Sequence, residues 1–315
     1  KMIVMSLLAA IIPMALYLVL LWKFDKYEPE PLKLVIFHFI WGASVSIFLG
    51  IAGSKFLSIP LELFLIIPEK ISFIQIILIA PIVEELSKGI LLFRTKNDMR
   101  FNTLIDGLVY GGAIGLGFGM TENFLYFITF GDTIQNLIWL IAIRSGFSAV
   151  MHGLATASFG ALLSVSKYSG DRNKKIMVLV GLIIAVSIHF IWNFSVSFSN
   201  TFLFGIFFIL TIIGIFLAVF VFSLRFEKRI IKDKLSDEIP ERFILILTST
   251  FRNSKGWFIE KYRKQFITAS INLAFRKREL ELSSKKMEVY IDDVEKLRNR
   301  VLELLQLNNK VENNI

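Results

Sequence analysis

Two adjacent glutamates lie in the middle of an apolar stretch of the chain. Glu84 and Glu85 stand within a run from Ile71 to Phe93 that is long enough to cross a membrane as a helix. A charged side chain at the centre of a bilayer costs about 2.5–3.5 kcal/mol, and such residues are therefore usually functional. Glu84 and Lys88 share a helix face and can pair, whereas Glu85 points about 100° away. We expect Glu84 to be a general base and Glu85 its helper. The alternative is a structural ion pair beside a neutral glutamic acid.

A third carboxylate lies on another hydrophobic stretch. Glu122 is followed by Asn123 and shares a helix face with Gly111, Gly115 and Phe118. Asp106 lies nearer the other end of the same stretch, and we count Asn123 and Asp106 as supporting residues. Glu122 could form a packing hydrogen bond, but with Glu84 and Glu85 in the chain we expect it to be a metal ligand or a second acid in a shared site.

Two histidines lie at similar depth on two further stretches. His152 shares a face with Arg144, and His189 shares a face with Asn193 in the string His-Phe-Ile-Trp-Asn. An isolated histidine in a helix bundle is usually a core residue, but two opposite a glutamate pair favour chemistry. Arg144 could neutralise a carboxylate or extend to the membrane surface. We interpret the remaining histidine, His38, as structural.

Carboxylate, imidazole and amide groups that converge in a wet pocket suit hydrolysis. A glutamate accepts a proton from water, a histidine or a metal polarises the scissile carbonyl, and Asn193 can donate to the oxyanion. Glutamate and histidine ligands could hold zinc, with Glu122, His152 and His189 as candidates, but a site without metal would have the same sequence. Burial in a membrane implies a substrate that arrives laterally, and we expect a single transmembrane helix.

Other protease chemistries fit the sequence poorly. The chain has no cysteine and no His-Glu-x-x-His motif, and no Gly-x-Gly-Asp on a hydrophobic stretch supports an aspartyl pair. Ser148 and His152 would lie on one helix, which is a poor basis for a serine–histidine pair. The glutamate and histidine residues therefore remain the candidates for catalysis.

The composition indicates a membrane protein with a soluble end. The chain has 315 residues, of which 55% are hydrophobic and 19% charged, where a soluble protein has about a quarter charged. Residues 1–224 carry 15 Lys or Arg and 12 Asp or Glu, and residues 225–315 carry 20 and 14. We therefore predict an all-α polytopic membrane domain over 1–224 and a basic cytoplasmic helical tail over 225–315. The membrane part has no basic stripe interleaved with aromatic residues, so cytoplasmic loops and the tail explain the net charge of +9 better than nucleic-acid binding does.

Hydrophobicity predicts about seven membrane spans. They cover residues 2–22, 34–53, 71–93, 103–130, 136–165, 176–197 and 201–224. Lys and Arg gather after the first, third, fifth and seventh spans and are rare after the others, which predicts an outer N-terminus and a cytoplasmic C-terminus. The first span lacks the features of a cleaved signal peptide, so we expect it to be retained. Small residues on the fourth and fifth spans predict close helix packing.

The tail has two features of helical structure. Apolar residues recur at spacings of four and three over about two heptads, which favours a short helical pair; they are Tyr290, Val294, Leu297, Val301 and Leu304. Residues 241–275 mix apolar and basic side chains, typical of either a small helical domain or a segment that contacts the inner leaflet or a regulatory partner.

The polar residues on these stretches resemble those of a known family. The matching pieces are Glu84-Glu85-x-x-Lys88, the region from Asp106 to Glu122-Asn123, Arg144 with His152, and His189-Phe-Ile-Trp-Asn193. This set is similar to the PrsW family of intramembrane proteases, within a group that includes the CAAX prenyl endopeptidases and the bacteriocin-processing enzymes. The resemblance covers most of residues 71–197 and no part of the tail. At Glu122 the prenyl endopeptidases carry a histidine.

The resemblance implies a multi-helix membrane peptidase whose glutamate pair activates water. It also implies that the histidines and Asn193 bind metal or stabilise the oxyanion, and that the substrates are membrane proteins such as anti-sigma factors. From the residues themselves, two other functions stay open. An ion-coupled transporter would also place Glu, His and Arg inside the membrane, and a non-catalytic scaffold or immunity protein would keep them for packing.

Overall fold

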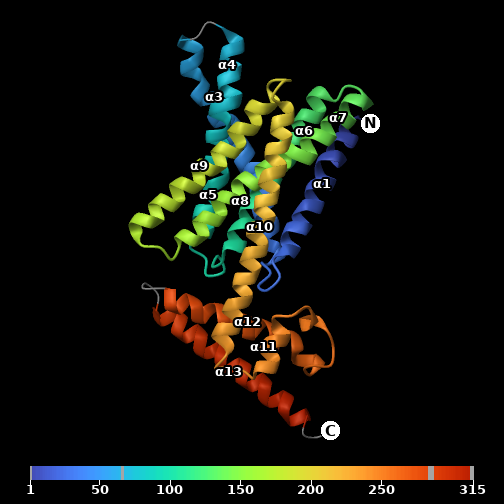
Figure 1. The fold of residues 1–315 in the computed structure, drawn as a ribbon. Helices are drawn as coiled ribbons and strands as arrows, with labels where there is room; N and C mark the ends of the chain where they lie inside the picture. Colours follow the sequence, from blue (N-terminus) through green and yellow to red (C-terminus); the bar gives the residue numbers. More distant parts are fainter. Residues whose placement is uncertain (1, 65–66, 283–286, 313–315) are drawn as a thin grey trace. The chain divides into compact units, whose positions relative to one another are not determined.

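The computed structural model describes residues 2–64, 67–282 and 287–312, and the residues it describes are helical with no strand. This confirms the predicted all-α membrane architecture. The chain divides into two compact units (Figure 1). The first, called the membrane unit here, comprises residues 1–25 and 29–220, and the second, the tail unit, comprises residues 26–28 and 221–315. The functional division at residue 224 stays a prediction.

Long helices build the membrane unit. They are α1 (Met2–Phe24), α2 (Leu32–Trp41), α3 (Ile47–Phe64), α4 (Pro68–Ile74), α5 (Ala80–Thr95), α6 (Leu104–Phe130), α7 (Ile134–Ile143), α8 (Ala149–Ser166), α9 (Asp171–Val196) and the first part of α10 (Phe202–Leu235). Three short π-helical segments join consecutive helices without a break; they are η1 (Gly42–Ser46), η2 (Gln75–Ile79) and η3 (Arg144–Ser148).

Six of the resulting helices are long and apolar enough to cross a membrane. They are Met2–Phe24, Leu32–Leu63, Leu104–Phe130, Ile134–Ser166, Asp171–Val196 and Phe202–Leu235. The seventh predicted span corresponds to α4, η2 and α5, which form one continuous helical segment. Glu84, Glu85 and Lys88 lower its apolar character, so composition alone does not class it as a span. The number of spans is therefore approximate.

Two of the three π-helical segments, η1 and η2, present backbone carbonyl groups to neighbouring helices. A π-turn interrupts the regular hydrogen bonds of a helix and is often found near functional sites. Thr121 donates to the carbonyl of Ala43 at 2.7 Å. In the same way Asn193 donates to the carbonyl of Ile76 at 2.9 Å, just before Pro81. The π-turn η2 ends two residues before Pro81, which has no backbone N–H to donate to the preceding turn.

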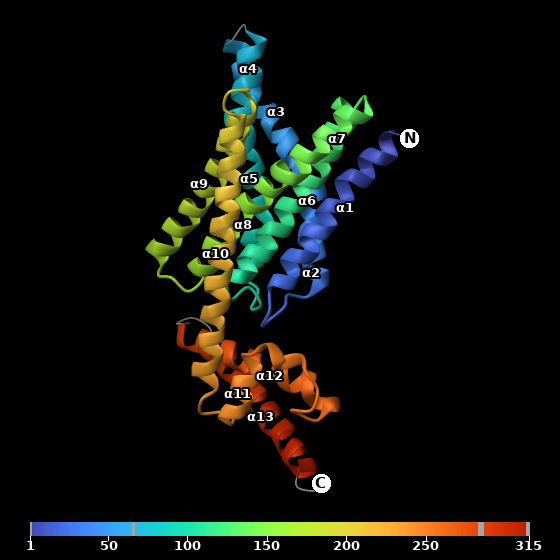
Figure 2. The same ribbon diagram turned by 45° about the vertical axis from the view of Figure 1, so that its right-hand side comes forward.

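Helix α6 is the central helix of the membrane unit and packs closely against α8 (Figures 1 and 2). A Cβ atom added at Gly115 would lie 2.1 Å from the carbonyl oxygen of His152, too close for any side chain. Small residues thus let the two backbones meet, as the sequence predicts. The contact fixes the position of His152, because it involves the backbone of that residue.

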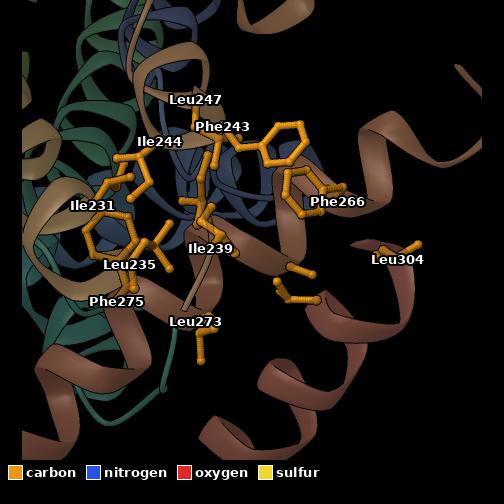
Figure 3. Close-up of a cluster of buried hydrophobic side chains, with 14 of the residues drawn as sticks. Ile231, Leu235, Ile239, Phe243, Ile244, Leu247, Phe266, Leu273, Phe275 and Leu304 are labelled. Atoms are coloured by element: carbon orange, nitrogen blue, oxygen red, sulfur yellow. The ribbon is translucent and has the colours of Figure 1, made fainter. Parts of the chain in front are cut away.

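The tail unit is a small helical domain with its own core. After the end of α10 it contains α11 (Glu241–Leu247), the 3₁₀ turn η4 (Thr250–Asn253), α12 (Glu260–Leu282) and α13 (Met287–Glu312). Phe243, Phe266 and Leu273 are almost fully buried in one apolar cluster (Figure 3). Four residues of the predicted apolar seam, Tyr290, Val294, Val301 and Leu304, are buried where α13 pairs with α12. The predicted helical pair is therefore present.

Ion pairs cover this core. Glu238 accepts hydrogen bonds from Lys277 Nζ at 2.7 Å and from Arg298 Nε at 2.9 Å. The hydrogen bonds from Arg298 are the main reason that the pKa of Glu238 falls to about 2, although burial opposes the shift. Glu238 links α12 and α13 to the turn that follows α10.

Candidate active site

A cavity of about 370 Å³ lies within the membrane unit, and five of the ten predicted site residues line it. Its polar lining residues are Ser54, Lys55, Ser72, Gln75, Glu84, Glu122, Tyr126, Arg144, Ser148, His152 and Asn193. They come from α3, α4, α5, α6, α8 and α9 and from the π-helical segments η2 and η3, so six helices and two π-helical segments contribute to one space. The cavity lies toward the end of the bundle where α6 ends and α9 reaches Val196, which by the predicted orientation is the outer side.

Glu84 lines the cavity, and one of its carboxylate oxygens lacks a hydrogen-bond partner in the described residues. Its Oε2 atom is buried and has no hydrogen-bond partner among the residues that the structure describes. The nearest charged or basic groups are Nε2 of His189 at 3.8 Å and Nζ of Lys88 at 3.9 Å. A buried carboxylate oxygen without a partner is costly unless water, metal or substrate contacts it. Glu84 is therefore placed to contact a reacting group.

Glu85 has the opposite surroundings. Its carboxylate accepts from Lys88 Nζ at 2.7 Å, from His189 Nδ1 at 3.1 Å and from Thr156 Oγ1 at 2.9 Å. The residue is 1% exposed and does not line the cavity. The sequence predicts that Glu84 pairs with Lys88; the ammonium group lies 3.9 Å from Glu84, and its direct hydrogen bond goes to Glu85. Three donors therefore fix the position of the Glu85 carboxylate.

Lys88 connects α5 to His152 on α8. Its ammonium group is fully buried and lies 2.9 Å from Nδ1 of His152 and 3.9 Å from the ring centroid of Phe118. An ammonium group can only donate, so Nδ1 of His152 must be the acceptor and Nε2 must carry the hydrogen. That Nε2 atom lies 2.8 Å from Glu122 Oε2 and donates to it.

His189 has one ring nitrogen fixed and the other turned toward Glu84. Nδ1 donates to Glu85, so that Nε2 carries a lone pair. The rings of His189 and His152 meet edge to face, with centroids 4.7 Å apart. In many metal sites one ring nitrogen of a histidine donates to a carboxylate while its other ring nitrogen faces the metal. The same arrangement leaves that second nitrogen free to accept a proton.

Glu122 and Arg144 form an ion pair at the cavity wall. Arg144 Nη2 donates to Glu122 Oε2 at 2.6 Å, and Arg144 Nε donates to Asn123 Oδ1 at 3.2 Å. The guanidinium group lies 3.4 Å from the ring centroid of Tyr126. Of the two roles considered for Arg144, the structure thus supports neutralisation of a carboxylate. Asn123 holds the guanidinium in place.

Asn193 lines the cavity but is already engaged on one side. Its Nδ2 atom donates to the carbonyl of Ile76, which ties α9 to η2. A side-chain amide nitrogen carries two hydrogens, so one remains for a second acceptor in the cavity.

Two predicted polar residues are used for structure and do not line the cavity. Asp106 accepts from the backbone nitrogens of Asn102 and Thr103 and forms a capping box at the start of α6. His38 has both ring nitrogens occupied, by the carbonyl of Leu34 at 2.7 Å and by Thr95 Oγ1 at 2.8 Å. The structural interpretation of His38 agrees with these contacts.

Sequence reasoning missed several residues that contact the site. Thr156 follows His152 by one helical turn, which was the available signal for its contact with Glu85. Tyr126 follows Glu122 at the same spacing. Gln75 and Lys55 lie near the ends of their predicted spans, where polar residues are common and carry little information.

Three of these residues could together hold a metal ion. One ligand atom from each of Glu84, His152 and His189 lies within 4.8 Å of the others. The unpartnered oxygen of Glu84 and the lone pair of His189 Nε2 both fit a cation, whereas His152 must give up one of its two hydrogen bonds. Carboxylate and imidazole ligands are those of zinc enzymes. Glu122, a predicted ligand, lies outside this group and contacts it through His152.

Comparison with known proteins identifies the family. Residues 30–224 match the model of the PrsW family intramembrane metalloproteases. The chain is 28% identical over 192 residues to Protease PrsW of Clostridioides difficile (strain 630), covering 59% of this chain and 77% of that protein. It is 24% identical over 179 residues to Protease PrsW of Bacillus subtilis (strain 168), covering 55% and 74%.

A third relative also matches the chain. It is Protease PrsW of Oceanobacillus iheyensis, 30% identical over 201 residues, which cover 62% of this chain and 84% of that protein. No solved structure matches the chain. The family model spans more than half of the chain and contains every residue of the cavity described above. The chain therefore belongs to the PrsW family of intramembrane metalloproteases.

Proposed function

We propose that this membrane protease hydrolyses its substrate at the cavity, with Glu84 as the group that accepts a proton from water. The observation that supports this role is the contrast between the two adjacent glutamates. Glu84 presents a buried, unpartnered oxygen at the cavity, while three donors from three helices occupy Glu85. A general base needs an acceptor atom within reach of the reacting water, and Glu84 has one.

Glu85 acts on the reaction through His189. By accepting from Nδ1 it keeps Nε2 as an acceptor and directs it toward Glu84. Nε2 has a single lone pair, so it can either accept from a water molecule that Glu84 also contacts, which orients the water toward a substrate carbonyl, or bind a metal ion. Thr156 and Lys88 hold Glu85 in this position.

Four polar side chains on the other side of the site form a continuous chain of hydrogen bonds. Lys88 donates to His152, His152 donates to Glu122, and Arg144 neutralises Glu122. Charges that are paired in this way can remain buried in the bilayer region. Arg144 and the second hydrogen of Asn193 are among the donors that line the cavity, and they would stabilise negative charge on the carbonyl oxygen during attack.

Glu84, His152 and His189 would hold the metal ion that the family description implies, and zinc suits these ligands. When bound, the ion would lower the pKa of a water molecule and polarise the carbonyl. Glu84 has two carboxylate oxygens, so that one can contact a metal while the other accepts the proton.

The substrate that fits this position is a membrane-anchored protein with a single span, such as an anti-sigma factor. The cavity is enclosed by membrane helices, so a peptide bond must reach it from within the bilayer or from the nearer surface. The loop charges place this end of the bundle outside and the tail in the cytoplasm. Cleavage should therefore occur in the outer half of the substrate span.

The test uses the purified full chain in detergent with a panel of single-span substrates. Wild type, His189→Ala and the matched surface variant Glu69→Gln are compared, each with and without a chelator, and bound metal is counted by elemental mass spectrometry. We expect cleavage by wild type and Glu69→Gln, a loss of about 10²–10⁴-fold in His189→Ala, and loss with chelator that zinc restores. Cleavage by His189→Ala at the wild-type rate and with wild-type metal content would contradict the assignment.

A further inference from the structure

The tail unit contains a second cavity, of about 290 Å³, that the protease reaction does not use. Three segments that are distant in sequence line it: the connection after α1, one face of α10, and the turn after α11. The lining residues are Lys26, Tyr27, Val221, Leu224, Arg225, Lys228, Thr248, Ser249 and Thr250. All of them belong to the tail unit.

Specific contacts hold the connection after α1 in this position. Tyr27 is 6% exposed and is part of the apolar core of the tail unit. Arg252 Nη2 donates to the carbonyl of Lys26 at 2.5 Å, and Trp257 Nε1 donates to the carbonyl of Arg252 at 3.1 Å. The cavity is thus a built feature of the fold, and the position of Lys26 is set by its own backbone.

Positive charge gathers around this cavity. Lys26, Arg225 and Lys228 line it, and none of them forms an ion pair with a carboxylate in the described parts of the chain. Burial lowers the pKa of Lys26, and the nearby positive charges of Arg252 and Lys228 lower it further. Glu227 is the acidic group that acts on Tyr27 here. A cation whose pKa is lowered by neighbouring cations is stabilised when an anion binds beside it.

The lining also changes from apolar to basic along the cavity, as a phospholipid changes from its chains to its headgroup. Val221, Leu224, Arg225 and Lys228 follow at spacings that place them along one face of α10. The two apolar residues come first, at the end of the predicted span, and the two cations come one turn later, where the headgroup region begins. Thr250 and Ser249 add hydroxyl groups beside the cations. A soluble phosphate would gain nothing from the apolar residues.

We propose that this cavity binds the phosphate of an anionic phospholipid headgroup, with the lipid chains beside Val221 and Leu224. Basic pockets at the ends of membrane helices are known to hold such headgroups, and each Lys or Arg contributes about a fivefold change in affinity. The bound lipid would link the connection after α1, the end of α10 and the turn after α11.

The test measures lipid binding to the purified full chain by native mass spectrometry, and it does not depend on protease activity. Phosphatidylglycerol is the probe, phosphatidylcholine the uncharged control, and glycerol phosphate and inorganic phosphate are the soluble competitors. One variant combines Lys26→Gln, Arg225→Gln and Lys228→Gln. The matched control combines Lys23→Gln, Arg229→Gln and Lys232→Gln, which removes three exposed charges from the same helix ends outside the cavity.

We expect one phosphatidylglycerol molecule per wild-type chain, retained in preference to phosphatidylcholine. The cavity variant should bind about 100-fold more weakly, and the control should stay within about threefold of wild type. The single variant Arg225→Gln should weaken binding about fivefold. Because the Arg225 side chain is exposed, this variant keeps the test valid if the triple variant unfolds. Equal loss in the cavity and control variants would overturn the proposal in favour of general charge attraction. Displacement by inorganic phosphate at equal concentration would overturn the lipid as ligand.

Discussion

The membrane unit and the tail unit place polar and apolar side chains in opposite ways. In the membrane unit Lys88 and Glu85 are buried, while Phe48 and Ile3 are 70% and 68% exposed. In the tail unit Phe266 and Leu273 are fully buried, and charged residues such as Lys296 lie at the surface. In lipid, helices do not gain free energy by hiding apolar side chains from each other, so close packing and polar contacts must hold them together. Polar groups at the centre of the membrane unit can therefore both stabilise it and serve catalysis.

The largest effect should follow from removing the charge that the membrane unit buries most deeply. Lys88→Met leaves the Glu85 carboxylate without its ammonium partner. We expect a loss of about 3–5 kcal/mol in the free energy of unfolding, because a buried charge is left unpaired, together with loss of cleavage. Thermal unfolding in detergent checks the first result, with Lys70→Met as the exposed control. Equal stability of the two variants would show that the buried ion pair does not support the fold.

A comparable change in the tail unit should act through apolar packing. Phe266→Ala removes a ring that lies 4.3 Å from the ring centroid of Phe258, and we expect a cost of about 3–5 kcal/mol to the tail unit. Hydrogen exchange of the full chain should show faster exchange over residues 221–312 and unchanged exchange in α6 and α8. Phe251→Ala, at a side chain that is 69% exposed, serves as control. Equal acceleration in α6 would contradict two separately stabilised units.

A smaller effect should follow from widening the contact between α6 and α8. Gly115→Ala places a methyl group against the carbonyl of His152 and must move that residue. A shift of about 1 Å at a catalytic group costs on the order of 100-fold in rate. Cleavage kinetics would measure it against Gly214→Ala, where an added Cβ meets nothing within 4 Å. Unchanged kinetics in Gly115→Ala would mean that the position of His152 is not critical.

The smallest expected effect concerns acid stability of the tail unit. The pKa of Glu238 is lowered to about 2 from its usual value of 4.5, so its ion pairs stabilise the folded state fully above pH 4.5. That stabilisation is lost as the pH falls from about 4.5 toward 2. The protection factors of amide hydrogens in α12 and α13, which correct for the intrinsic exchange rate at each pH, should therefore fall over this range more in wild type than in Glu238→Gln. The exposed Glu288→Gln variant should behave like wild type, and a wild-type response in Glu238→Gln would contradict the account.

The sequence predicts the architecture and the residues that meet at the site better than it predicts their contacts. Long apolar runs identify membrane helices, and the cost of exposing Glu84, His152 or His189 to lipid requires that they face one another. The seam from Tyr290 to Leu304 likewise predicts the pairing of α13. These features depend on helical periodicity and on solvent preference, which a single sequence carries.

The contacts of each side chain depend on distances that periodicity does not fix. Residues three and four apart on a helix are both neighbours, so the sequence cannot decide that Lys88 lies 2.7 Å from Glu85 and 3.9 Å from Glu84. The hydrogen bond between Asn193 and Ile76 requires the π-turn of η2, of which Pro81 was the available sign. Asp106 shows the same limit, since an acidic residue two positions after a helix start serves equally as a cap or as a ligand.

The division of roles between the two glutamates is tested most directly by comparing Glu84→Gln with Glu85→Gln in the purified full chain. Both variants keep the side-chain size and remove one charge, and cleavage rate and thermal unfolding are measured for each. We predict that Glu84→Gln loses cleavage by about 10²–10⁴-fold and unfolds at the wild-type temperature or above, because Oε2 of Glu84 has no hydrogen bond to lose within the described residues and its nearest cationic group lies 3.9 Å away. Glu85→Gln should unfold at a lower temperature. Cleavage by Glu84→Gln at the wild-type rate would contradict the account.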